Sequence, residues 1–416
     1  MCIIIEFNFS AHIIFCKIIK NYKMKKIFFL FLLMGINIGS LIAQKPEKIY
    51  SYVKTEKSHE FYKQQVELWW KEIEKDIKNE DAWYNYYKAN RNSYYSFKEV
   101  GSNLEKEQEW KQESAYNKNL DAIRDLIKKN IPNTFTDYVT RKRSPFDNET
   151  FYNINKAYDL KPNAGEIYPL MITHYELNAN NDKRKEINRK MYEANELSSG
   201  LINYGYNVLM TLKPNSILLT YGDNETYPIW LLQDVYNLRR DVIVMVLPML
   251  TVKDYRTIMF TKIGIPNNSS KNDNGTFEEN QHEIAGYILS NVNLTEHPVY
   301  ISLGASHTVK NFESNLYLVG LALEYSKTNI DNIALLRNNF ENKYALDYTT
   351  IGFGYDISAS IVNKMNTNYF PGILKLYNYY KSAGDIDAAE KMKIIGLKIA
   401  EKNNQSWYDY AKSVLK

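Results

Sequence analysis

Apolar residues follow two different periodicities along this chain. In residues 45–200 and again in 370–403 they recur every three or four positions, as on the buried face of an amphipathic helix. Residues 216–221, 242–247 and 297–303 are instead short apolar runs bounded by turn-forming residues, which is typical of buried parallel strands. The pattern predicts an α/β fold with large all-α flanks.

The central region predicts a small parallel βαβ sheet. Between the strands 216–221 and 242–247, Ile229, Trp230 and Val235 fall on one face of a helix over 228–238. A helix is expected over 252–263, a polar loop over 267–275 and a helix over 283–289. Residues 314–325 mix helix and strand signals and receive no assignment.

Helices on either side of this sheet have repeat-like spacing. In the N-terminal region they are expected over 59–77, 81–91, 105–129, 151–160 and 166–177. Near the C-terminus, 374–383 and 386–402 form two helices around Gly384-Asp385, and the small Ala388 and Ala400 allow close helix approach. This hairpin resembles a tetratricopeptide repeat, a type of array that usually binds other chains.

These boundaries predict four segments. Residues 1–43 form an N-terminal extension with a signal peptide, and 44–200 form a helical, repeat-like domain. The α/β domain spans 201–340, and a C-terminal helical hairpin or repeat spans 341–416.

Export is predicted by the N-terminus. Lys25-Lys26 precede an apolar run over 27–34 and a weaker one over 35–43, which is the order of a secretory signal peptide cleaved after Ala43. An uncleaved membrane tether is the alternative, and either Met1 or Met24 can be the start. We therefore expect the periplasm or the outer cell envelope as the location.

Composition excludes several classes of function. Residues 1–43 hold five lysines and one glutamate, so the remainder has 52 − 5 = 47 basic and 48 − 1 = 47 acidic residues. This neutral balance excludes a basic surface for nucleic acid. Both cysteines, Cys2 and Cys16, precede residue 44, so the mature chain has no disulfide and no thiolate metal site.

The turn after the first strand holds the best candidate site. Gly222 would permit a sharp turn, Asp223 and Asn224 would leave the sheet there, and Thr226 would cap the helix. Ligands of open α/β folds bind beyond the carboxyl ends of the strands, where a helix N-terminus favours anions. Tyr227 belongs to the same candidate set. The alternative is that Asp223 and Asn224 only cap the helix and close the turn.

Two further candidates follow the neighbouring strands. Asp254 comes after the second strand and His307 after the third, so parallel strands would bring both to the edge where Asp223 lies. His307 is otherwise an ordinary loop histidine. The chain has no HExxH, P-loop, GxGxxG or GxSxG motif, and its six histidines exclude a histidine-rich metal site. We assign no metal, no cofactor and no catalytic residue.

The run from Leu218 to Asp234, followed by Arg240-Asp241-Val242, resembles a family signature. It is similar to the soluble C-terminal region of large bacterial polytopic membrane proteins, a domain of unknown function associated with membrane glycosyltransferases of the protein O-mannosyltransferase type. The resemblance covers residues 214–402 but lacks the membrane-embedded transferase portion, so it implies no transferase activity. The residues that it marks are Gly222, Asp223, Asn224, Thr226, Tyr227, Trp230, Arg240 and Asp241.

Two functional hypotheses follow. The first is a secreted, non-catalytic cell-envelope module that binds a glycan, a peptide or a partner protein through an α/β domain held by helical repeats. The alternative is a carbohydrate- or phosphate-processing enzyme that uses Asp223 as a metal ligand or general base. A purely structural envelope protein is also compatible with the chain.

Overall fold

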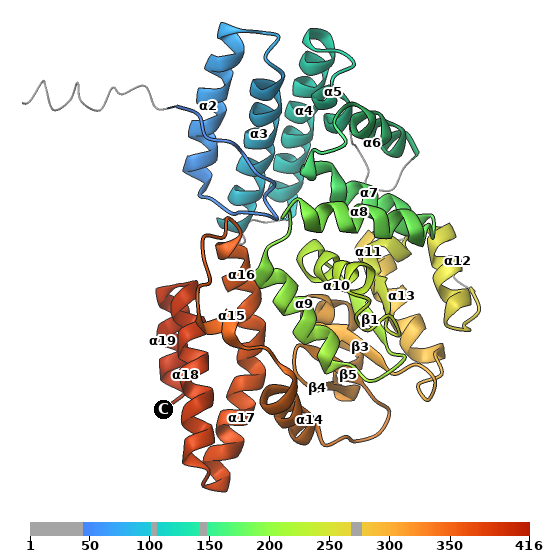
Figure 1. Ribbon diagram of the computed structural model, residues 1–416, viewed down its shortest axis with the longest axis vertical. Helices are drawn as coiled ribbons and strands as arrows, with labels where there is room; N and C mark the ends of the chain where they lie inside the picture. Colours follow the sequence, from blue (N-terminus) through green and yellow to red (C-terminus); the bar gives the residue numbers. More distant parts are fainter. Residues whose placement is uncertain (1–44, 101–105, 142–147, 268–276) are drawn as a thin grey trace, which may run out of the picture.

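The structure is a computed structural model that describes residues 45–100, 106–141, 148–267 and 277–416 (Figure 1). The predicted signal peptide and nearly all of the predicted loop over 267–275 lie outside these residues. Among the described helices, none combines the length and the apolar character that a membrane crossing requires.

The N-terminal region is helical, as predicted. Helix α3 begins earlier than expected because the Asn79 side chain, rather than Asp81, accepts a hydrogen bond from the Ala82 N–H at 3.0 Å. The elements are α2 (His59–Lys75), α3 (Glu80–Val100), α4 (Lys106–Asn130), α5 (Phe135–Thr140), α6 (Asn148–Leu160), η1 (Gly165–Ile167), α7 (Tyr168–Leu177) and α8 (Asn181–Glu193).

A five-stranded mixed sheet forms the centre of the α/β part, in the order β2-β1-β3-β5-β4. Strand β1 pairs in parallel with β2 and with β3, whereas β5 is antiparallel to β3 and to β4. The three predicted strands are confirmed, and the unassigned residues 314–325 form the two antiparallel strands. The strands are β1 (Ile217–Thr220), β2 (Ile243–Val246), β3 (Val299–Ser302), β4 (Leu316–Leu318) and β5 (Ala322–Tyr325).

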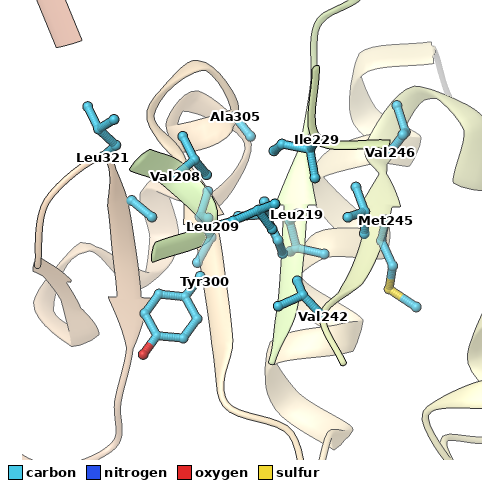
Figure 2. Packing of buried hydrophobic residues seen from close by; sticks show 14 of the residues in the cluster. Val208, Leu209, Leu219, Ile229, Val242, Met245, Val246, Tyr300, Ala305 and Leu321 are labelled. Atoms are coloured by element: carbon cyan, nitrogen blue, oxygen red, sulfur yellow. The ribbon is translucent and has the colours of Figure 1, made fainter. Parts of the chain in front are cut away.

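Helices cover this sheet and complete its core. Figure 2 shows Leu219 of β1 and Met245 of β2 in one buried cluster with Val208, Leu209 and Ile229 from two covering helices. The βαβ unit and both later helices are confirmed. The elements around the sheet are α9 (Ser199–Thr211), α10 (Asp223–Val235), α11 (Leu247–Leu250), α12 (Lys253–Lys262), α13 (Phe277–Asn291) and η3 (Leu303–Asn315).

The C-terminal hairpin also has its predicted form. Gly384 adopts a left-handed conformation (φ 78°) at the end of one helix, and Asp385 caps the next by accepting from the Ala388 N–H at 3.1 Å. Its membership of a tetratricopeptide array stays a prediction. The elements are α14 (Asn332–Asn338), η4 (Asn339–Lys343), α15 (Asp347–Thr350), α16 (Ala359–Asn366), η5 (Thr367–Tyr369), α17 (Phe370–Ala383), α18 (Ile386–Asn403) and α19 (Gln405–Val414).

The largest buried cluster joins all three regions. It runs from Phe135 in α5 through the sheet to Leu415, so α5 to α8 share a core with the α/β part and with the C-terminal hairpin. A separate cluster around Trp83 and Ile127 holds α2, α3 and α4 together. In Figure 1 these first helices stand at one end of the molecule. The division at residues 200 and 340 stays a prediction.

Candidate functional site

The turn after β1 is built differently from the prediction. Helix α10 begins at Asp223 with Gly222 as its N-cap, so Thr226 lies one turn inside the helix and is not the cap. The Thr226 hydroxyl donates hydrogen bonds to the Gly222 carbonyl and to Thr220 Oγ1, each at 2.9 Å. Gly222 has φ −109°, and a Cβ there would meet no atom within 4 Å. A side chain at this position would therefore not obstruct the turn.

Glu225 is the central polar residue of the turn, and the sequence analysis missed it. Its side chain is 5% exposed, and its carboxylate accepts hydrogen bonds from the Ser302 hydroxyl at 2.7 Å and the Gly304 N–H at 2.9 Å. Burial raises the pKa of Glu225, and the two hydrogen bonds oppose that rise. The carboxylate thus joins the end of β1 to the end of β3.

Two other residues of the turn contact the N-terminal helices and their leading segment. The Tyr227 hydroxyl lies 2.8 Å from Thr173 Oγ1 and donates to the Pro169 carbonyl at 3.1 Å. The Asn224 side chain donates to the Val53 carbonyl at 3.2 Å. Burial also raises the pKa of Tyr227, so its phenol stays neutral and acts as a donor. These residues hold α10 against the helical region.

The later part of the signature forms a buried ion-pair network. The Arg184 guanidinium donates to both Asp234 oxygens at 2.9 Å and lies 5.6 Å from the centre of the Trp230 ring. The Asn188 side chain donates to Asp234 at 2.7 Å. Arg184 also pairs with Glu176. Trp230 and Asp234 therefore fix α10 on α8 and belong to the packing of the fold.

Arg239, rather than Arg240, carries the contacts at the end of the signature. Its guanidinium donates to the carbonyls of Leu209 and Leu212, where α9 ends, and to both oxygens of Asp241. Cations at a helix C-terminus satisfy its free carbonyl groups. Among the described residues, Arg240 has one hydrogen bond, of 3.4 Å, to Asn237.

His307 lies at the predicted sheet edge, in contact with the residue that follows β1. Its ring packs against Tyr221, with centroids 4.6 Å apart, and its Nδ1 lies 3.0 Å from the Gly304 carbonyl. Asp254 is an exposed residue in the first turn of α12. A ligand at this edge stays a prediction.

The possible metal ligands among the described residues are dispersed. They contain no group of three or more histidine, cysteine, aspartate or glutamate side chains placed to hold a metal ion. Asp223 lies at the helix N-terminus and Glu225 is fully engaged by Ser302 and Gly304.

A groove lies elsewhere, between the segment before α2 and the segment before α16. Its volume is about 510 Å³, which falls within the range of about 300–1,000 Å³ typical of ligand sites. Tyr355 is 93% exposed at this groove. The groove is lined by Glu47, Lys48, Ile49, Tyr50, Thr55, Glu56, Lys57, Phe61, Tyr62, Tyr355, Asp356, Ile357, Ala359 and Ser360.

Residues 201–322 match the family model described as TMEM260-associated domain 2. The match begins in α9 and ends at the first residue of β5, so it contains the turn, Glu225 and the strands β1 to β4. This supports the coarser part of the resemblance, a domain of unknown function linked to a membrane-protein family. No curated protein and no solved structure matched the chain.

Proposed function

We propose that the protein is an exported, non-catalytic binding module of the cell envelope. The domain of residues 201–322 serves as a scaffold, and the groove between the two flanking segments takes the ligand. The proposal departs from the sequence-based expectation in one respect, because it moves the ligand from the turn after β1 to the groove.

The distribution of polar contacts supports this assignment. In the signature, the side chains of Glu225, Thr226 and Asp234 hydrogen bond to other parts of the chain. Buried groups that are satisfied internally stabilise the fold, and they are not free to bind a ligand without being broken apart. We therefore assign the signature residues to the attachment of α10 to the surrounding elements and not to a reaction.

One observation carries the proposal: a tyrosine side chain that is 93% exposed stands at a groove with a buried floor. Ile49 and Tyr62 form that floor, and both are 1% exposed. Lys57 lies 6.0 Å from the centre of the Phe61 ring, which places charge beside an aromatic surface. Aromatic faces with polar groups around them suit both sugars and peptides.

The test is binding by the purified protein to arrayed oligosaccharides and arrayed peptides. We expect one class to bind, with at least a tenfold loss of affinity for Tyr355→Ala. Tyr152→Ala is the matched control, because Tyr152 is a 59% exposed tyrosine on α6 that does not line the groove. If a ligand bound equally to Tyr355→Ala, the groove would not be its site.

Export has its own test. The proposal rests on the charged and apolar order of residues 25–43. We expect protein recovered from the envelope of an expressing bacterium to begin at Gln44, as measured by the mass of its N-terminal peptide. An intact N-terminus in the cytoplasmic fraction would contradict export.

A further inference from the structure

The segment that precedes α2 is held along one edge only. The Glu47 N–H donates to Gln65 and the Ile49 N–H donates to Asn85, each at 2.8 Å. The Glu47 carbonyl accepts from the Trp69 indole at 2.9 Å. From Glu47 to Ile49, alternate residues thus turn their backbone groups toward α2 and α3, with the two-residue period of a β-strand. This period ends at Tyr50, whose carbonyl accepts from the Asn92 side chain of α3 at 2.9 Å.

The intervening residue presents the opposite edge. Lys48 is exposed and lines the groove, and within the described ranges neither its N–H nor its carbonyl has a hydrogen-bond partner. In a strand, the residue between two inward-facing residues directs its backbone groups the other way. An unpaired strand edge is a template for another extended chain.

We propose that the groove binds a peptide in an extended conformation, which adds to residues 47–49 as a second strand. The inference rests on the proposed binding function and names its ligand class. Backbone hydrogen bonds from Lys48 would supply affinity, as in other cases of strand addition. Tyr355 on the other wall would cover the apolar side chains of the peptide.

The charges of the groove also suit a peptide. Lys48 and Lys57 lie among Glu47, Glu56 and Asp356, so both signs line one cavity. Glu56 pairs with Lys364 at 3.1 Å and Lys48 lies 3.9 Å from Glu166, so charged side chains of a peptide would join these ion pairs rather than meet free charges. Charge complementarity of this kind mainly supplies specificity.

The experiment separates backbone pairing from side-chain contact. A displayed library of seven-residue peptides is selected on the purified protein, and the tightest binder is synthesised. Lys48→Pro removes the outward N–H without breaking a hydrogen bond of the fold, and Lys48→Ala keeps the N–H while removing the charge. We expect the Kd to rise at least tenfold for Lys48→Pro and to stay within threefold for Lys48→Ala.

A second measurement does not depend on how Lys48→Pro folds. Two copies of the peptide are made, one with N-methyl groups at its odd-numbered residues and one with them at its even-numbered residues. One of the two copies should bind at least tenfold more weakly than the unmethylated peptide, because only one set of N–H groups would face Lys48. If neither methylated peptide nor the Lys48→Pro variant changed the Kd, strand addition would be overturned. If only oligosaccharides bound the groove, the peptide inference would fail while the binding function stood. If neither class bound, both would fail.

Discussion

A Cβ on Gly304 would lie 2.6 Å from Oε1 of Glu225, the same atom that accepts the Gly304 N–H at 2.9 Å. The buried carboxylate therefore binds the backbone of Gly304, the second residue after β3, and leaves little room for a side chain there. The two residues follow the neighbouring parallel strands β1 and β3, and their contact lies at the edge of the sheet where the sequence suggested a ligand.

Gly304→Ala should destabilise the protein by this contact. We expect the free energy of unfolding to fall by about 1–3 kcal/mol, because the carboxylate is held by Ser302 and cannot move aside easily. Urea unfolding monitored by tryptophan fluorescence measures the change. Gly352→Ala is the matched control, since a Cβ there meets no atom, and it should shift stability by less than about 0.5 kcal/mol. An equal loss in both variants would contradict the assigned role of Glu225.

The buried Glu225 carboxyl should make stability depend on pH. Its pKa in the folded protein lies above that of the unfolded chain, so the folded state binds the proton more tightly. The stability that the folded state gains from this tighter proton binding is fully present below the unfolded pKa of Glu225, and it is lost as pH rises through the folded pKa. Relative to wild type, Glu225→Gln should therefore gain stability between about pH 4 and pH 8. The free energy of unfolding of both proteins is measured across this pH range. If the difference between Glu225→Gln and wild type were constant, the pKa of Glu225 would not be raised.

Arg184→Ala should be among the most destabilising single changes. It leaves Asp234 and Glu176 buried without their cation, and breaking a buried pair costs about 3–5 kcal/mol. Lys183→Ala removes an exposed pair with Glu186 from the same helix and should leave the unfolding midpoint unchanged. Thermal unfolding followed by circular dichroism compares the two. A mild effect of Arg184→Ala would mean that water replaces the guanidinium.

Asp223→Ala distinguishes the binding module from the enzyme. Asp223 stands in the first turn of α10, where an acidic side chain favours the helix dipole, so its loss should cost at most about 1 kcal/mol. Peptide or oligosaccharide binding in the groove should be unchanged in an equilibrium titration. Loss of ligand binding in a variant of normal stability would instead support a site at the turn.

Elements with regular spacing could be predicted from the sequence. The helices around Gly384 and the βαβ unit from residue 216 to 247 form as expected, because a period of 3.6 residues or a continuous apolar run reports local burial directly. The start of α10 could not be placed from local signals. Thr226 has the chemistry of a cap, but its hydroxyl instead meets Thr220 from the preceding strand.

By itself, the sequence determined the order of helices and strands, the neutral charge of residues 44–416 and the polar turn after the first strand. Only the tertiary structure decided what those polar groups contact. Glu225 meets Gly304, 79 residues later, and Lys48 shares a groove with Tyr355. Such pairs carry no local pattern, because they are set by how distant elements pack against one another rather than by the spacing of neighbours along the chain.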